Sequence, residues 1–346
     1  MTTVNNTALF IVHLPSLSPD CYRPLSQPIA NLTRITAKRL LVVLVSEEFD
    51  DAAGIPSEHS RHGNVERDEV HWHAIQRLLT FVYVQASKVA AEQDNLLLQI
   101  DVLLKTPHQL RTHRLDSQRG DEEVVNVVYR FENDHLEVSP SLARASQRRL
   151  GSLGPHASST INDAQDEQDE PKKFSTPLSR FPVIALGGTF DHLHAGHKIL
   201  LSMAAWLASE RLIAGVTDTS LLGSKSNNEY LEPLETRIGR TRAFLELFKP
   251  SLTYDVVPIK DVYGPTGWDP DVQALVVSRE TLSGAAAIAT HRAAHDLPAL
   301  ETFVIHVISA KDESIVLEDA VELRKAKMSS TAIREWIAAR VGREYD

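Results

Sequence analysis

The fold is decided by the stretch Leu186-Gly187-Gly188-Thr189-Phe190-Asp191-His192-Leu193-His194-Ala195-Gly196-His197. The apolar residues 183–186 lead into it and are typical of a buried strand. After it, apolar side chains recur at helical spacing, at Ile199, Leu200, Met203, Ala204 and Leu207. The stretch therefore predicts a strand, a glycine turn and the first turn of a helix.

The turn at Gly187 and Gly188 suits the binding of a phosphate chain. Backbone N–H groups and the positive end of the helix dipole meet where the helix begins. Glycine lets the backbone come close to a ligand because it has no Cβ. His194 and His197 are three residues apart, so both rings leave the same side of the helix. We therefore predict a polyphosphate site here.

Strands and helices alternate through the rest of the C-terminal half. The predicted strands are 183–186, 212–217, 253–259, 274–277 and 303–308, and the predicted helices are 232–248, 282–295, one from His197 and one from Thr331. The last helix is expected to bury Ile333, Trp336 and Ile337. Alternation of this kind predicts a doubly wound, Rossmann-like parallel sheet, in which ligands bind at the carboxyl ends of the strands.

The first half carries no pattern that indicates chemistry. Apolar runs at 9–12, 40–45, 96–104 and 124–129, with a helical segment at about 70–92, predict a smaller α/β or α+β domain over residues 1–144. Residues 145–179 are polar, acidic and interrupted by proline, so we expect a disordered acidic linker. The third predicted segment, residues 180–346, is the domain with the glycine turn.

Composition limits the classes of partner. The net charge of −10 argues against a nucleic acid or an anionic membrane as the main partner. The single cysteine, Cys21, excludes an internal disulfide framework and fits a reducing compartment. The N-terminus lacks the cationic start of a signal peptide, and no apolar run approaches the roughly 20 residues of a membrane span. We expect a cytoplasmic protein.

Two motifs carry a resemblance to a known family. Residues 188–191 with 194–197 resemble the H-x-G-H signature of the nucleotidylyltransferase superfamily, and 327–334 resemble its second signature, of the K-M-S-K-S or I-S-S-T-x-x-R type. Between them, 261–270 and 276–281 look like the eukaryotic phosphopantetheine adenylyltransferases, in their fungal-like monofunctional form. The resemblance implies the Rossmann-like fold of that superfamily.

It also implies an activity, the transfer of the adenylyl group of ATP to 4′-phosphopantetheine, which gives dephospho-coenzyme A and pyrophosphate. The attacking phosphate has a second pKa near 6, so it is largely ionised at pH 7 and needs no general base. The reaction needs alignment and positive charge around the phosphates. Mg²⁺ is expected to arrive with the ATP, held by phosphate oxygens. The implied partners are ATP, 4′-phosphopantetheine and other enzymes of the coenzyme A pathway.

The resemblance assigns roles residue by residue. His197 and His194 would donate hydrogen bonds to the ATP phosphates, with His197 nearest the α-phosphate, while Thr189 and Lys225 would hold the attacking phosphate. The residues that the resemblance places around ATP are Gly187, Gly188, Thr189, Phe190, His194, His197, Arg292, Lys327, Ser329, Ser330, Thr331 and Arg334.

Alternative interpretations stay open at this point. One is a nucleotidylyltransferase with another acceptor, such as glycerol phosphate, phosphocholine, FMN or nicotinamide mononucleotide. Another is a catalytically silent, nucleotide-binding scaffold. Arg237 and Arg240 suit either an exposed ion-pair face or a ligand contact. A zinc cluster of Asp191 with the neighbouring histidines is disfavoured, because no cysteine lies near the glycine turn.

The sequence contains no G-x-x-x-x-G-K-[ST] phosphate loop of the kind that a kinase of the next pathway step would carry. We therefore expect a monofunctional protein that makes dephospho-coenzyme A but does not phosphorylate it.

Overall fold

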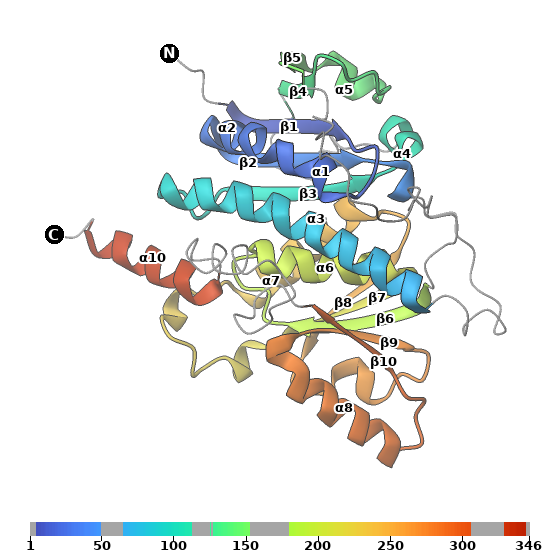
Figure 1. The fold of residues 1–346 in the computed structure, drawn as a ribbon. Coiled ribbons are helices and arrows are strands. Elements are labelled where there is room, and N and C mark those ends of the chain that lie inside the picture. The colour runs from blue at the N-terminus through green and yellow to red at the C-terminus, as the bar shows by residue number, and fades with distance from the viewer. Residues whose placement is uncertain are drawn as a thin grey trace, which may run out of the picture.

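The chain builds two parallel sheets, one from each half of the sequence (Figure 1). The computed structural model describes residues 5–49, 65–112, 125, 127–152, 180–305 and 329–343. Within these ranges, no helix combines the length and the apolar character that crossing a bilayer requires.

The first sheet has five strands in the order β3-β2-β1-β4-β5, and all neighbouring strands are parallel. The central strand β1 and its neighbour β2 are buried on both faces along most of their length, which explains why their sequences are nearly continuous apolar runs. The five strands are β1 (Asn5–His13), β2 (Thr36–Val45), β3 (Gln99–Lys105), β4 (Val127–Phe131) and β5 (Ser146–Leu150).

Helices connect these strands, so the first half is an α/β structure, one of the two classes predicted. The longest is α3 (Val65–Glu92), close to the helix expected at 70–92. The shorter ones are α1 (Pro19–Tyr22), α2 (Ser26–Arg34), α4 (Pro107–Thr112) and α5 (Pro140–Arg144), with 3-10 turns at Arg23–Leu25 and Glu47–Phe49.

Two boundaries in this half differ from the prediction. Strand β3 begins at Gln99 rather than at 96, because the Leu98 N–H bonds the Asn95 carbonyl in a turn that leaves Leu97 exposed. The expected linker from 145 begins with β5 instead, which pairs with β4 along its whole length. An edge strand needs backbone pairing rather than apolar side chains, so its polar sequence resembles a linker. Residues 153–179 lie outside the described ranges.

The second sheet has the order β10-β9-β6-β7-β8 and is also parallel throughout. Counted from the first strand of each half, both sheets have the strand order 3-2-1-4-5. This is the doubly wound arrangement that the sequence predicted. The strands are β6 (Phe181–Gly188), β7 (Ala208–Thr217), β8 (Thr253–Ile259), β9 (Ala274–Ser278) and β10 (Glu301–Ile305).

Helices cover both faces of the second sheet. Those of the second half are α6 (Ala195–Leu207), α7 (Leu234–Phe248), α8 (Leu282–Ala294) and α10 (Ser330–Arg343), with 3-10 turns at Thr219–Leu221, Asn228–Tyr230, Gly264–Gly267 and Arg279–Thr281. Helix α8 packs on one face over its own small core, while α6 and α7 cover the face that is turned toward the first half (Figure 1).

Helix α10 also reaches the first half. Ile333 is buried, as predicted, but Trp336 and Ile337 are only half-buried. The Trp336 indole N–H donates to a carboxylate oxygen of Asp94, at the turn before β3, and Arg340 pairs with the same carboxylate. The indole therefore stays near the surface because it has a hydrogen-bond partner there.

The two halves share one hydrophobic core. Buried residues of both sheets, of α3 and of α6 belong to a single cluster. The ring of Phe49 meets Trp206 edge-on at 5.9 Å between ring centroids, and Trp72 packs against Phe303 at 5.4 Å. The ammonium of Lys105, in β3, donates to the Phe248 carbonyl at the end of α7 over 2.6 Å.

A shared core predicts that the two halves unfold together. Phe49 is 1% exposed, and truncating such a ring costs about 3–5 kcal/mol. We expect Phe49→Ala to shift one cooperative transition, measured by urea unfolding with both tryptophan fluorescence and far-UV circular dichroism. Leu221→Ala, at an exposed leucine, is the control and should shift it little. Two separate transitions, of which only one moves, would contradict the shared core.

Candidate active site

The glycine turn lies at the carboxyl end of β6, where the topology of the second sheet reverses. Strand β6 has β7 on one side and β9 on the other, and such a switch point is the usual ligand site of an open parallel sheet. A Cβ on Gly188 would lie 3.0 Å from the Phe190 ring, which is fully buried beneath the turn. Glycine at 188 therefore makes room for Phe190.

The two histidines lie together at the start of α6. His194 is the N-cap residue, and its ring stacks on that of His197 with 3.9 Å between centroids and an interplanar angle of 24°. The Phe190 ring supports His197 from below in an edge-on contact at 5.3 Å. In the described part of the chain, both Nδ1 atoms are buried and have no hydrogen-bond partner. A buried polar atom without a partner is typical of a site that a ligand completes.

Both imidazoles are neutral at pH 7. Burial, aided by the charges of Lys198 and His192, lowers the pKa of His194 to about 3. Burial and the neighbouring His194 also hold the pKa of His197 well below its ordinary value. A neutral imidazole has one N–H donor and one acceptor nitrogen, so each ring offers one hydrogen bond to a phosphate oxygen.

The second signature begins in contact with the first. The Ser330 hydroxyl, at the start of α10, donates to the Asp191 carbonyl over 2.8 Å. Ser329 accepts a hydrogen bond from the backbone N–H of Ala332 and so caps the helix. Thr331 is exposed on the first turn, and Lys327 lies outside the described residues. The start of α10 thus lies against the glycine turn that precedes α6.

The buried side chain of Arg334 connects the two signature motifs. It is 1% exposed, its guanidinium pairs with the buried Asp191 carboxylate at 2.5 Å, and its Nε donates to the Ser226 carbonyl. A buried carboxylate requires such a counter-charge. These contacts join the two signatures and the loop after β7 through Arg334, and the expected contact of Arg334 with a phosphate stays a prediction.

The remaining predicted residues are divided between the site and its surroundings. Thr189 follows β6 directly, and Lys225 is exposed on the loop after β7, next to the residue that contacts Arg334. Arg292, in contrast, is 1% exposed and donates to the carbonyls of Thr266, Asp269 and Pro298. These bonds fix the loop before β9. The buried Nη2 of Arg292 has no hydrogen-bond partner among the described residues, and the expected contact of Arg292 with ATP stays a prediction.

Arg237 supports the turn after β6, a role that the sequence did not indicate. It is fully buried in α7, so it belongs to neither of the two roles considered for it. Its guanidinium donates to the carbonyls of Thr189, Thr217 and Glu232 at 2.8, 2.8 and 3.0 Å. It thereby ties the ends of β6 and β7 to the start of α7. An arginine on a helix gives no sequence signal of this burial.

Three side chains near the turn could be mistaken for a metal centre. Oxygen and nitrogen atoms of Asp191, His192 and Glu232 lie within 4.8 Å of one another. However, Arg334 pairs with Asp191, Arg240 pairs with Glu232, and the His192 backbone N–H occupies the other Glu232 oxygen. Both carboxylates are neutralised by arginine, so this group does not fit a resident metal ion.

Comparison with known proteins agrees with this site. The cytidylyltransferase-like family model matches residues 185–336. A phosphopantetheine adenylyltransferase of Saccharomyces cerevisiae is 44% identical over 156 residues, 45% of this chain and 48% of the yeast protein. An uncharacterized protein of Schizosaccharomyces pombe is 36% identical over 215 residues, 62% of this chain and 65% of that protein. The chain thus spans about half to two thirds of these two fungal relatives.

A shorter relative is covered almost completely. The phosphopantetheine adenylyltransferase of Methanopyrus kandleri is 40% identical over 130 residues, 38% of this chain and 82% of that protein. The fold and the paired signatures define a nucleotidyltransferase of the cytidylyltransferase-like class. Within that class, the chain belongs to the phosphopantetheine adenylyltransferase family, which confirms the resemblance seen in the sequence.

The depressed pKa of His194 predicts how stability depends on pH. Between pH 6.5 and about 3, the unfolded imidazole binds a proton that the folded one does not, so stability falls as the pH falls. His194→Asn removes this difference. From pH 7 to pH 5 the wild type should therefore lose about 1–2 kcal/mol more stability than the variant, measured by urea unfolding. His135→Asn, at an exposed histidine, should lose as much as the wild type. Equal losses in wild type and His194→Asn would mean that His194 titrates normally.

Proposed function

We propose that residues 180–346 transfer the adenylyl group of ATP to 4′-phosphopantetheine, releasing pyrophosphate and forming dephospho-coenzyme A. The observation that carries the proposal is the stacked pair His194 and His197 at the start of α6, with buried Nδ1 atoms that lack a partner in the described structure. The start of α10 lies against the same turn. The yeast and Methanopyrus kandleri relatives named for this activity support the choice of acceptor.

The chemistry fits a site without a general base. The acceptor phosphate is already ionised, so its oxygen attacks the α-phosphorus directly. A new P–O bond forms to the acceptor, and the bond to the bridging oxygen breaks and leaves its electron pair with pyrophosphate. Neutral imidazoles suit this step as fixed hydrogen-bond donors, and the positive end of α6 adds to the stabilisation of the crowded phosphate oxygens.

In this proposal, the role of each residue of the site follows from its position. His197 and His194 donate to the α-phosphate region, while Gly187 and Gly188 admit the phosphate chain at the end of β6. Thr189 and Lys225 orient the acceptor phosphate. The hydroxyl-bearing residues Ser329, Ser330 and Thr331, with Lys327, receive the β- and γ-phosphates.

Mg²⁺ enters this reaction as part of the ATP complex, bound by phosphate oxygens and water. The nearest carboxylates, Asp191 and Glu232, are held by arginines, which agrees with a metal that travels with the substrate. A single cysteine and an ATP-dependent reaction fit the cytoplasm as the place of this activity.

Pyrophosphate release from MgATP and 4′-phosphopantetheine by the full chain tests the proposal. Removing one donor to a developing charge costs about 10²–10³ in rate, so His197→Ala and His194→Ala should each lower kcat by about that factor. His295→Ala is the matched control, because His295 is an exposed histidine at the end of α8. It should leave kcat unchanged.

The acceptor is tested in the same assay with glycerol 3-phosphate, phosphocholine, FMN and nicotinamide mononucleotide. Turnover with one of these and not with 4′-phosphopantetheine would mean that the proposed acceptor is wrong, while the proposed transfer of a nucleotidyl group would stand. ATP binding without turnover of any acceptor would favour a nucleotide-binding scaffold and overturn the proposed activity.

A further inference from the structure

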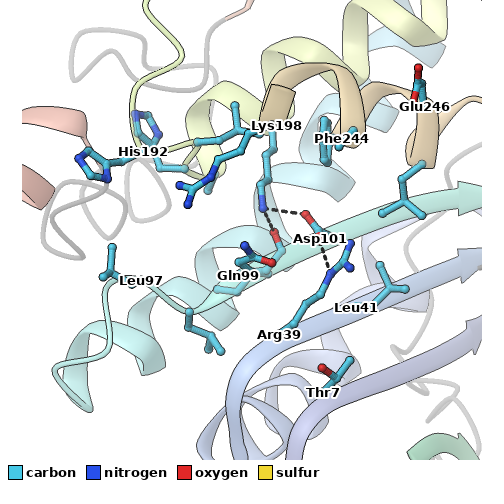
Figure 2. A pocket seen from close by; sticks show the side chains of 18 of the residues that line it. Thr7, Arg39, Leu41, Leu97, Gln99, Asp101, His192, Lys198, Phe244 and Glu246 are labelled. Atoms are coloured by element: carbon cyan, nitrogen blue, oxygen red, sulfur yellow. Dashed lines mark hydrogen bonds and ion pairs between the residues drawn. The ribbon is translucent and has the colours of Figure 1, made fainter. Parts of the chain in front are cut away.

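Lys198 is the charged residue that follows His197 on α6, and it points into the first half of the chain. It is 5% exposed, and its ammonium donates to the Asp101 carboxylate at 2.7 Å and to the Ile100 carbonyl at 2.8 Å (Figure 2). The ammonium also lies 5.7 Å from the centre of the Phe244 ring. The partners of the Lys198 ammonium thus come from β3 and α7.

Asp101 belongs to β3, one of the two edge strands of the first sheet. It is 4% exposed, and Arg39 of the neighbouring strand donates to its second oxygen at 2.9 Å (Figure 2). Burial alone would raise the pKa of Asp101, but Lys198 and Arg39 outweigh it and hold that pKa below its ordinary value. The carboxylate therefore stays charged and bridges a cation of each half.

This bridge lines a cavity between the halves that also reaches His192 and His194. The cavity has a volume of about 860 Å³, and its wall includes Asp101, Lys198, Leu193 and His194. In Figure 2, Arg39 and Asp101 rise from the strands of the first sheet toward Lys198 on α6. The contact therefore involves the residue that directly follows His197, one of the two stacked rings.

We propose that Asp101 is a positioning residue: it holds Lys198, and through it the first turn of α6, so that His194 and His197 are aligned for the reaction. The first half of the chain is then part of the catalytic unit. The Lys198 backbone N–H bonds the His194 carbonyl, so a shift of Lys198 moves the turn that carries both rings. Because small displacements of aligned groups cost large factors in rate, the bridge acts on turnover.

The inference rests on the proposed function for its rate measurement, and a pair of variants separates positioning from stability. Asp101→Asn leaves the Lys198 ammonium without its carboxylate partner and should lower both the melting temperature and kcat. We expect kcat to fall about tenfold or more, while the KM for ATP should stay within twofold of the wild-type value. In the triple variant Arg39→Met/Asp101→Leu/Lys198→Met, apolar packing replaces all three charges of the bridge and should recover the melting temperature. We expect kcat to stay low in the triple variant, because the link that sets the position of α6 is gone.

The matched control is Asp134→Asn. Asp134 is also a buried aspartate, paired with Arg130 at 2.7 Å, but within the first half. It should lower the melting temperature and leave kcat unchanged. Equal losses of kcat in both aspartate variants, or full recovery of kcat in the triple variant, would mean that the bridge only stabilises the fold, and would overturn the proposal.

A second readout does not need the reaction. In full-length protein labelled with ¹⁵N-histidine, Asp101→Asn should move the imidazole signals that are assigned by His194→Gln and His197→Gln, whereas Asp134→Asn should not. If the wild type transfers no adenylyl group to any acceptor, the proposed function fails, and these signals still decide the positioning role. Unmoved signals in Asp101→Asn would overturn it.

Discussion

The structure depends on one constraint, that α6 must be buried along almost its whole length while its first turn stays open to a ligand. From Lys198 to Leu207 every side chain of this helix is buried. A helix that is apolar on all sides needs packing partners on all sides. The second sheet supplies one set of partners and the first half supplies the other, which is why the two sheets share a core.

Near the site, buried carboxylates and backbone carbonyls need hydrogen-bond or ion-pair partners. Two arginines and one lysine, all buried, provide these partners. Arg334, Arg237 and Lys198 are all buried, and each joins segments that are far apart in the sequence. Arg237 meets the backbone carbonyls of Thr189 and Thr217 at the carboxyl ends of β6 and β7, where such groups lack a neighbour in the sheet. Arg334 instead meets the Asp191 carboxylate and a loop carbonyl. These buried contacts lie beside the turn that carries the two histidines.

The sequence predicted the parts of the site that local signals encode. Glycines 187 and 188, the apolar strand before them and the helical spacing after them are short-range patterns, so the strand, turn and helix were foreseen. The spacing after His197 indicated one buried face of α6, but nothing indicated that the opposite face packs against residues more than 100 positions earlier. The burial of Arg237, Arg292 and Arg334 depends on which carbonyls the fold brings together, and composition does not encode it. Strand β5 was missed because its side chains are polar and exposed.

The shared core has a consequence for the covalent chain. The two sheets are held by packing between α3, α6 and β3 and by the contacts of Lys105, Asp94 and Lys198, all of which lie outside the segment that joins the sheets. A single peptide bond cleaved between Ser152 and Arg180 would sever the backbone without removing any of these contacts. The nicked molecule would keep its shape as a complex of two fragments. The same halves could be supplied as separate polypeptides that assemble on each other.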